Sequence, residues 1–179
     1  MITYDNGALV IPHFLSDEEC DALIKRSESI GYEGALIQTR GPSDAQSVRS
    51  NERILFDDYE LAKALFLRIK VSLPKEIDNW QPSGLNEKFR FYKYTDGQYF
   101  KWHVDGSFKR DYFEVSKLTA IFYLNTIIDA GGETEFEDMS VSPEKGKLLL
   151  FPHKLRHQGV PPASGVKYVL RTDVMYAKT

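Results

Sequence analysis

The sequence has only one cysteine, Cys20, and no long apolar run among its 179 residues. A lone cysteine excludes a disulfide within the chain and is typical of a reducing compartment, so we expect a cytoplasmic protein. No stretch approaches the roughly 20 apolar residues that a membrane-spanning helix needs. The first residues also lack the basic and apolar regions of a signal peptide. These absences predict a soluble protein that makes no contact with a membrane.

Concentrated positive charge is also lacking. The formal net charge is −3, whereas a nucleic-acid groove usually needs a strongly basic face. The sequence contains no repeat, low-complexity tract or long linker. We therefore expect one domain, residues 1–179, that does not bind nucleic acid.

Two helices are predicted in the first half of the chain. The first starts at Ser16, because Glu19 follows at the spacing of a capping box, and Gly31 is a plausible end. Cys20 lies on the apolar side of this helix, which predicts that it is buried. The second helix runs from about 58 to 73 and is closed by Pro74. The polar segment Gln38–Asn51 between them is predicted to be a loop.

From Lys88 onward the apolar pattern changes to the two-residue period of β-strands. Strands are predicted near 88–95, 99–105, 117–125, 134–137, 147–152, 156–160 and 166–176. Helices followed by many short strands indicate an α+β chain with a double sheet or jelly roll as its core. Residues 1–87 would then be mainly helical support, and residues 88–179 would form the core.

The motif His103-Val104-Asp105 lies in one of these predicted strands. Alternate side chains of a strand share a face, so the imidazole of His103 and the carboxylate of Asp105 point the same way. An imidazole beside a carboxylate makes two-thirds of the 2-His-1-carboxylate triad that suits non-haem Fe(II) oxygenases. The motif alone has low specificity, and the prediction depends on a third ligand.

Two histidines are the candidates for that third ligand. His153 and His157 both lie far downstream in the chain, and spacing alone leaves the choice between them open. His153 follows a proline at the end of an apolar strand, which favours a turn position. His13 precedes the first helix and is predicted to be an ordinary polar residue.

The stretch from Tyr94 to Tyr176 carries a set of short motifs in a fixed order around these histidines. They are Tyr94 with Gly97-Gln98, His103-Val104-Asp105, Leu118-Thr119-Ala120-Ile121-Phe122-Tyr123-Leu124-Asn125, Gly131-Gly132-Glu133-Thr134-Glu135-Phe136, Pro143-Glu144-Lys145-Gly146-Lys147-Leu148-Leu149-Leu150-Phe151-Pro152, His157 with Pro161, and Lys167. In content and order this stretch resembles the catalytic region of Fe(II)/2-oxoglutarate-dependent dioxygenases, particularly the prolyl 4-hydroxylase-like branch. The resemblance covers nearly half the chain and implies a double-stranded β-helix, or jelly-roll, core.

The resemblance implies that His157 is the third metal ligand, and therefore that His103, Asp105 and His157 form the catalytic metal centre. In the family a proline follows the distal histidine after four residues, and a basic residue that binds 2-oxoglutarate follows after about ten. His157 meets both conditions through Pro161 and Lys167, whereas His153 meets neither.

The resemblance also implies a pocket for 2-oxoglutarate. Lys167 is the expected anchor, because a buried carboxylate needs a cation to offset its desolvation. Arg171 shares a strand face with Lys167 and remains an alternative anchor. Tyr94 and Tyr123 match family positions that line this pocket, although both could instead be core aromatic residues. Thr134 is a further candidate for the same cavity.

The function implied is hydroxylation of an unactivated C–H bond, with Fe(II), 2-oxoglutarate and O2 required and with release of succinate and CO2. Ascorbate is a candidate further cofactor. Asp105 favours hydroxylation, because related halogenases lack this carboxylate. The substrate could be a peptidyl proline, or a free amino acid or other small metabolite. A jelly-roll protein that binds metal without turnover is the alternative from another class.

Overall fold

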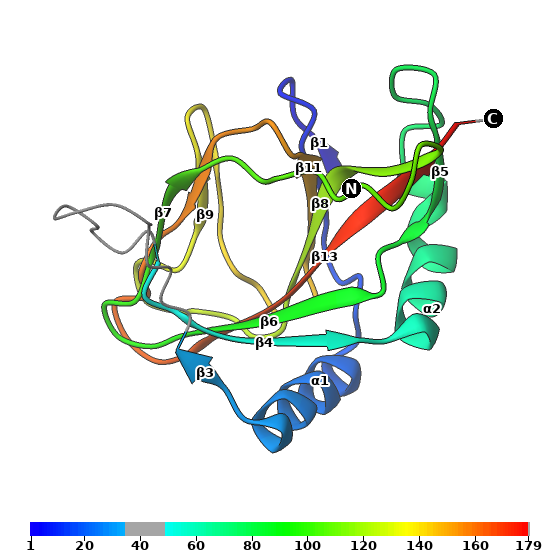
Figure 1. The fold of residues 1–179 in the computed structure, drawn as a ribbon. Coiled ribbons are helices and arrows are strands. Elements are labelled where there is room, and N and C mark those ends of the chain that lie inside the picture. The colour runs from blue at the N-terminus through cyan, green and yellow to red at the C-terminus, as the bar shows by residue number, and fades with distance from the viewer. Residues whose placement is uncertain (35–48, 179) are drawn as a thin grey trace, which may run out of the picture.

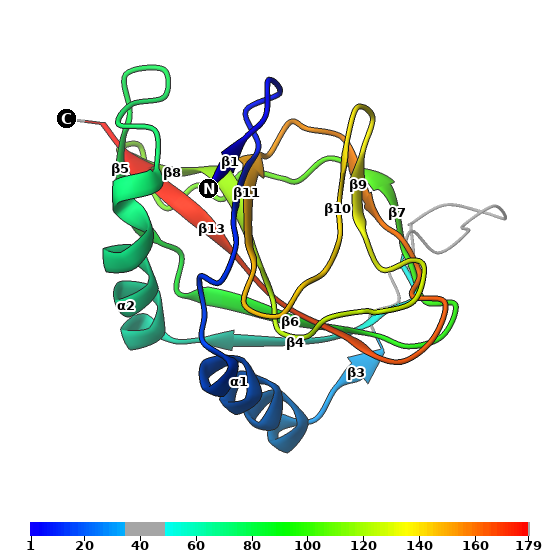
Figure 2. The same ribbon diagram turned by 180° about the vertical axis from the view of Figure 1, so that it is seen from behind.

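Two β-sheets face each other in the computed structural model, and both α-helices lie on the outer side of the larger sheet (Figures 1 and 2). The structure describes residues 1–34 and 49–178. The predicted loop Gln38–Asn51 therefore lies outside the described residues for most of its length.

Both predicted helices are confirmed. The helical elements are α1 (Asp17–Ile30), α2 (Tyr59–Ile69) and the short 3-10 helix η1 (Lys70–Ser72). Ser16 and Glu19 form the reciprocal capping box at the start of α1, and Cys20 is fully buried. Within the described residues, no helix is long and apolar enough to cross a membrane.

Within residues 1–34 and 49–178, the main sheet is antiparallel throughout and contains nine strands. Its strands, in spatial order, are β1 (Ile2–Thr3), β2 (Leu9–Ile11), β11 (Leu148–Pro152), β8 (Glu114–Tyr123), β13 (Lys167–Ala177), β6 (Lys88–Tyr94), β4 (Glu52–Asp57) and β3 (Glu33–Gly34), while β5 (Gln81–Leu85) pairs with β13. Strand β13 lies near the middle of the sheet and is the longest strand described. It pairs with β8, β6 and β5.

The minor sheet, as far as the chain is described, has four antiparallel strands. In spatial order they are β10 (Ser140–Val141), β9 (Thr134–Phe136), β12 (His157–Gly159) and β7 (Phe100–His103). Figure 2 shows β7, β9 and β10 on the side of the molecule away from α2. The candidate metal ligands His103 and His157 thus belong to the minor sheet.

The seven strands predicted from Lys88 onward are all present, with shifts of a few residues at their ends. The prediction missed β10, the two-residue strand Ser140–Val141, and two of its parts were wrong. The strand predicted to reach Asp105 ends at His103. The first 87 residues are less helical than expected, because they also supply β1 to β5. Strand β5 contains Pro82 and Gly84, which are poor strand formers, and is supported by its pairing with β13.

Alternation along the main sheet divides the core into two apolar layers. Phe89 and Phe91 of β6 face α1 and α2, together with residues of β8, β11 and β13. Tyr92 and Tyr94 of the same strand face the minor sheet and pack in the second layer. The candidate site lies in this second layer, between the two sheets.

Candidate active site

His103 and His157 are brought together by the pairing of β7 with β12. The two residues are direct partners in this antiparallel ladder, and their ring centroids are 4.2 Å apart. Directly opposed side chains lie on the same face of a sheet, and here that face looks toward the main sheet. The Phe100 ring stacks on the His103 ring, with 3.7 Å between the two ring centroids. The position of both imidazoles therefore follows from strand register.

Asp105 completes the cluster from just beyond the end of β7. Its backbone N–H donates to the carbonyl of His153 at 3.0 Å, and the intervening Val104 is 57% exposed. The Asp105 carboxylate lies 3.6 Å from Nε2 of His103 and 3.8 Å from Nε2 of His157. One ligand atom from each of the three residues lies within 4.8 Å of the others. The geometry and the donor types therefore fit a single metal ion.

Both imidazoles are held with Nε2 facing the cluster. Nδ1 of His103 donates to the carbonyl of Lys101 at 2.7 Å, and Nδ1 of His157 donates to the carbonyl of Leu155 at 2.9 Å. Because a carbonyl oxygen can only accept, the proton of each neutral ring is on Nδ1 and the lone pair is on Nε2. Burial lowers the pKa of His157 to about 4, so this ring is neutral at pH 7.

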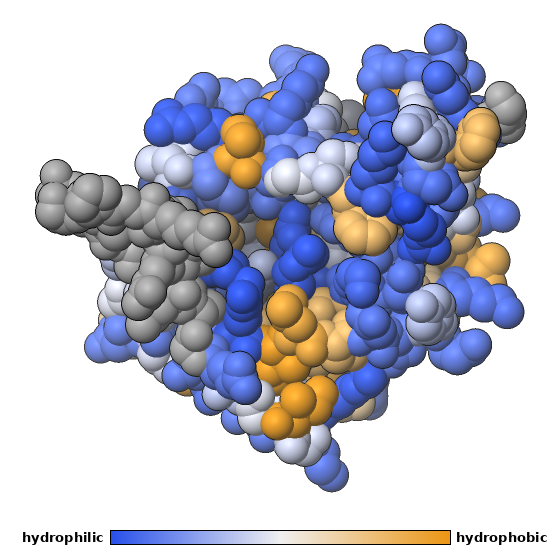
Figure 3. Space-filling model, in the orientation of Figure 1, coloured by the Kyte–Doolittle hydropathy of each residue, from blue (hydrophilic) through white to orange (hydrophobic). Residues whose placement is uncertain are grey.

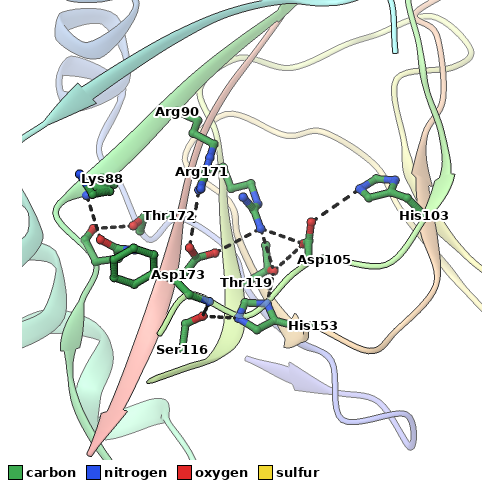
Figure 4. Close-up of polar contacts among 12 residues, drawn as sticks. Lys88, Arg90, His103, Asp105, Ser116, Thr119, His153, Arg171, Thr172 and Asp173 are labelled. Atoms are coloured by element: carbon green, nitrogen blue, oxygen red, sulfur yellow. Dashed lines mark hydrogen bonds and ion pairs between the residues drawn. The ribbon is translucent and has the colours of Figure 1, made fainter. Parts of the chain in front are cut away.

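The Asp105 carboxylate is held from behind by two donors (Figure 4). Its Oδ2 accepts from the Thr119 hydroxyl at 2.6 Å and lies 3.1 Å from the Arg171 guanidinium. Burial acts to raise the pKa of Asp105, but Arg171, His103 and Thr119 outweigh it and hold this pKa well below its usual range. Arg171 also contacts the buried carboxylate of Asp173 at 3.2 Å.

A cavity opens in front of the cluster. It is lined by Tyr92, Tyr94, Phe100, His103, Asp105, Ile121, Thr134, His157, Gln158, Gly159, Lys167, Val169 and Arg171. Lys167 lies at the start of β13, directly opposite Tyr94 in the ladder, and its ammonium is 4.7 Å from the centre of the Tyr94 ring.

Lys167 is the unusual group in this cavity. It is only 2% exposed, and within the described part of the chain its ammonium has no hydrogen-bond or ion-pair partner. Burial lowers the pKa of Lys167 to about 7, and Glu133 opposes this effect only in part. An unpaired buried cation is costly unless an anion joins it. The cavity is therefore suited to an anionic ligand.

The remaining predicted pocket residues take different positions. Tyr94 and Thr134 both line the cavity, whereas Tyr123 does not reach its wall. The Tyr123 hydroxyl instead donates to Oγ1 of Thr134 at 2.6 Å, and both groups are buried. Tyr123 is thus placed to act on the pocket through Thr134.

Gly131, shortly before β9, lies at a position that only glycine fits. It has φ +89°, and a Cβ at this position would lie 2.2 Å from the carbonyl oxygen of Pro161. The next residue, Gly132, donates its N–H to the same carbonyl at 3.1 Å. Close backbone approach at this point connects the Gly131 segment with the segment that follows His157.

His153 contacts the residues behind Asp105, which the sequence did not predict. The turn position predicted for it is confirmed, and it does not line the cavity. Its ring is buried behind Asp105, where it bonds to Ser116 and Thr119. The sequence carried no signal for this contact, because it depends on how β8 and β11 pair.

Comparison with known proteins gives a family match and several similar folds. The family model of the 2OG-Fe(II) oxygenase superfamily matches residues 89–172. No curated protein sequence matches the chain. The structure resembles a viral collagen prolyl hydroxylase from Paramecium bursaria Chlorella virus-1, solved as a 2-oxoglutarate complex, with 26% identity and a TM-score of 0.65 over 95% of this chain and 96% of that one.

Two further similar structures establish the shared fold. A prolyl-4-hydroxylase from Pseudomonas putida has 20% identity and a TM-score of 0.68, with 98% of this chain and 94% of that chain covered. A Trichoplax adhaerens prolyl hydroxylase, bound to a peptide of a hypoxia-inducible factor, has 19% identity and a TM-score of 0.68, with 95% and 84% covered. The predicted α+β fold with a jelly-roll core is confirmed.

The fold and the cluster of candidate ligands define a non-haem oxygenase with a jelly-roll core. More particularly, residues 89–172 match the 2OG-Fe(II) oxygenase superfamily, and the chain resembles the prolyl hydroxylase branch of that family. It is therefore an enzyme, a hydroxylase dependent on Fe(II) and 2-oxoglutarate, and not a metal-binding protein without turnover.

Proposed function

We propose that His103, Asp105 and His157 are the three protein ligands of the Fe(II) ion. The observation that carries this proposal is the direct pairing of His157 with His103 across β12 and β7. Both Nε2 lone pairs face an ionised Asp105, and three such ligands leave open positions on an octahedral metal. Val104, which lies between the two proposed ligands in the chain, is 57% exposed and does not line the cavity.

We further propose that Lys167 binds the far carboxylate of 2-oxoglutarate. Its burial without a partner in the described residues supports this assignment, since the incoming anion would relieve the desolvation of the ammonium. Arg171 is a weaker candidate, because Asp105 and Asp173 already neutralise it. Tyr94 and Thr134 would contribute polar contacts in the same cavity, and Tyr123 would orient Thr134.

When bound, the ion, 2-oxoglutarate and O2 together supply the oxidant, and succinate and CO2 are released as a C–H bond is hydroxylated. The chain's own contribution is to position these reactants and to exclude water. The apolar side chains of Phe100, Ile121 and Val169 form much of the cavity wall and serve this purpose. Ascorbate is a candidate reductant for keeping the iron in the ferrous state.

The substrate is a peptide or a small molecule, and we propose a peptidyl proline. Two of the similar structures are named collagen prolyl hydroxylase and prolyl hydroxylase with a bound peptide. A surface groove lined by Arg53, Leu55 and Arg90 follows β4 and β6, strands that extend from the edge of the cavity at Tyr92. Apolar side chains gather on the surface where these strands run (Figure 3). Such an open surface would suit a peptide better than a free amino acid, which is the alternative.

The same proposal includes a cytoplasmic location, no nucleic-acid substrate, and one catalytic domain spanning residues 1–179. The single cysteine and the net charge of −3 support the first two parts. The continuous main sheet, which contains strands from both halves of the chain, supports the third.

A metal titration tests the ligand set. We expect wild-type protein to bind one equivalent of Co(II), used as an air-stable probe of the Fe(II) site, and His157→Ala to lose this binding. His13→Asn is the matched control, because His13 is exposed and far from the cluster in the chain. Equal Co(II) affinity in wild type and His157→Ala would exclude His157 as a ligand.

Succinate release tests the substrate. Purified protein with Fe(II) and 2-oxoglutarate is offered proline-containing peptides and, separately, free amino acids and other metabolites. We expect a peptide to raise succinate release above the uncoupled background and to gain one oxygen atom by mass spectrometry. Stimulation by a free amino acid alone would favour the alternative.

A further inference from the structure

His153 lies four positions before the proposed ligand His157, yet its ring points to the back of the site. It follows β11 in a turn, is 8% exposed and does not line the cavity. Figure 4 shows it on the side of Asp105 away from His103. Four groups lie in a chain through this ring: the backbone of Phe108, then Ser116, His153 and Thr119. The chain ends on the carboxylate of Asp105.

The directions of these hydrogen bonds follow from the donor inventory of each group. The ionised Asp105 carboxylate can only accept, so the single hydroxyl proton of Thr119 points at Oδ2, 2.6 Å away. Oγ1 of Thr119 must then accept from Nδ1 of His153 at 2.9 Å. This fixes the proton of a neutral His153 on Nδ1.

The other end of the ring is assigned in the same way. Nε2 of a neutral His153 protonated on Nδ1 is an acceptor, and the Ser116 hydroxyl donates to it at 2.8 Å. Ser116 Oγ in turn accepts from the backbone N–H of Phe108 at 2.7 Å. Every bond in the series thus runs in one direction, from a backbone amide to the carboxylate of Asp105.

We propose that His153 is a positioning residue for the metal centre, which fixes the Thr119 hydroxyl on Oδ2 of Asp105 and so leaves Oδ1 free to bind the metal. Arg171 contacts the same Oδ2 at 3.1 Å, which gives this oxygen two donors. Without the His153 donor, the Thr119 oxygen keeps only the longer contact from Arg171 at 3.4 Å, so the Thr119 hydroxyl can rotate away and leave Oδ2 with Arg171 alone. The inference rests on the proposed ligand set, because the carboxylate must be a ligand for its orientation to matter.

Matched variants separate this role from simple packing. His153→Leu and His153→Asn introduce side chains of nearly equal size, but only asparagine retains a donor that can reach Thr119. Thr119→Val and Thr119→Ser form a second pair, in which only serine retains the hydroxyl. Losing a group that orients a metal ligand typically costs about 10–100-fold in metal affinity.

The experiment is calorimetric titration of each folded variant with Co(II), together with the visible absorption spectrum of the bound ion. We expect His153→Leu and Thr119→Val to bind Co(II) about tenfold or more weakly and with an altered spectrum. His153→Asn and Thr119→Ser should recover most of the affinity. On the Thr119→Val background, His153→Leu should add little, because the two residues act through one bond.

Three results would overturn the inference. They are wild-type affinity in His153→Leu, equal losses in the leucine and asparagine variants, and fully additive losses in the double variant. Failure of the ligand set itself looks different, since His157→Ala would then bind Co(II) as well as wild type does. Urea unfolding of each metal-free variant checks that the fold persists, and Thr119→Val and Thr119→Ser test the proposal if the residue 153 variants do not fold.

Discussion

Lys167 and Arg171 are two buried basic residues, four positions apart on the same face of β13. The groups around the two side chains differ. Lys167 faces a cavity and has no ionic partner among the described residues. Arg171 lies against Asp105 and Asp173, at 3.1 and 3.2 Å. The first cation is therefore prepared for an anion from outside, whereas the second is already part of the protein's own structure.

The titration behaviour of the two groups differs in the same way. Burial lowers the pKa of Lys167 to about 7. Burial also acts to lower the pKa of Arg171, but Asp105 and Asp173 outweigh it and raise this pKa above its usual value. The comparison teaches that exposure alone does not identify a ligand-binding cation, because both side chains are nearly inaccessible. What distinguishes them is whether the charge is compensated.

The largest expected effect is the loss of 2-oxoglutarate binding in Lys167→Met. Removing a charge-assisted contact to a buried carboxylate should cost about 3 kcal/mol or more, which is a loss of affinity above about 100-fold. The same change should raise the melting temperature of the ligand-free protein, because an uncompensated buried cation disappears. Calorimetry with 2-oxoglutarate on the Co(II)-loaded protein measures the affinity, and a thermal melt of the ligand-free protein measures the melting temperature.

Lys147→Met is the control for this change. Lys147 is also largely buried, but its ammonium is satisfied by the Ser142 carbonyl and Glu144. We expect this variant to bind 2-oxoglutarate as wild type does. If Lys167→Met kept normal affinity while Arg171→Met lost it, the anchor would be Arg171.

Arg171→Met should have the opposite effect on stability. It leaves the buried Asp105 without a cation and Asp173 with only Arg90, at 3.6 Å, and breaking a buried ion pair in this way costs about 3–5 kcal/mol. Metal affinity should fall by about 10–100-fold, because Asp105 loses one of the groups that orient it. Urea unfolding and Co(II) titration measure both losses. A variant as stable as wild type would show that Arg171 is not the structural cation described here.

Much of this comparison could be predicted from the sequence, and some could not. The period of two placed His103 and Asp105 on one face, and it placed Lys167 and Arg171 together on another. Whether each side chain faces a cavity, as Lys167 does, or carboxylates, as Arg171 does, depends on which strands are neighbours. Strand neighbours are set by long-range contacts, which a local pattern does not encode.

The choice between His153 and His157 illustrates the same limit. Spacing left both open, and only the family resemblance favoured His157. In the structure the difference is one of register: His157 lies opposite His103 in the ladder, whereas His153 lies in the turn after β11. Strand β5 was missed for a related reason, since its stability comes from β13 and not from its own residues.

The pH dependence of 2-oxoglutarate binding should reveal the unpaired cation. Since Lys167 has a pKa of about 7 in the free enzyme and must be charged to bind the anion, binding above pH 7 requires proton uptake. Affinity should therefore be nearly constant below pH 6 and fall about tenfold between pH 6 and pH 8. Lys167→Arg should flatten this profile, because arginine stays charged throughout. A flat wild-type profile would contradict the assignment.

The smallest expected effect separates the two tyrosines of the pocket. Tyr94→Phe removes a hydroxyl from a residue of the cavity wall, whereas Tyr123→Phe removes only the bond to Thr134. Tyr123→Phe should cost about 1 kcal/mol of stability, which lowers the melting temperature of a chain this size by about 2–4 °C. Its 2-oxoglutarate affinity should change less than that of Tyr94→Phe, measured side by side on Co(II)-loaded protein. The reverse order would mean that Tyr123 contacts 2-oxoglutarate directly. The pocket beside Lys167 would then extend further between the two sheets than the cavity in the structure does.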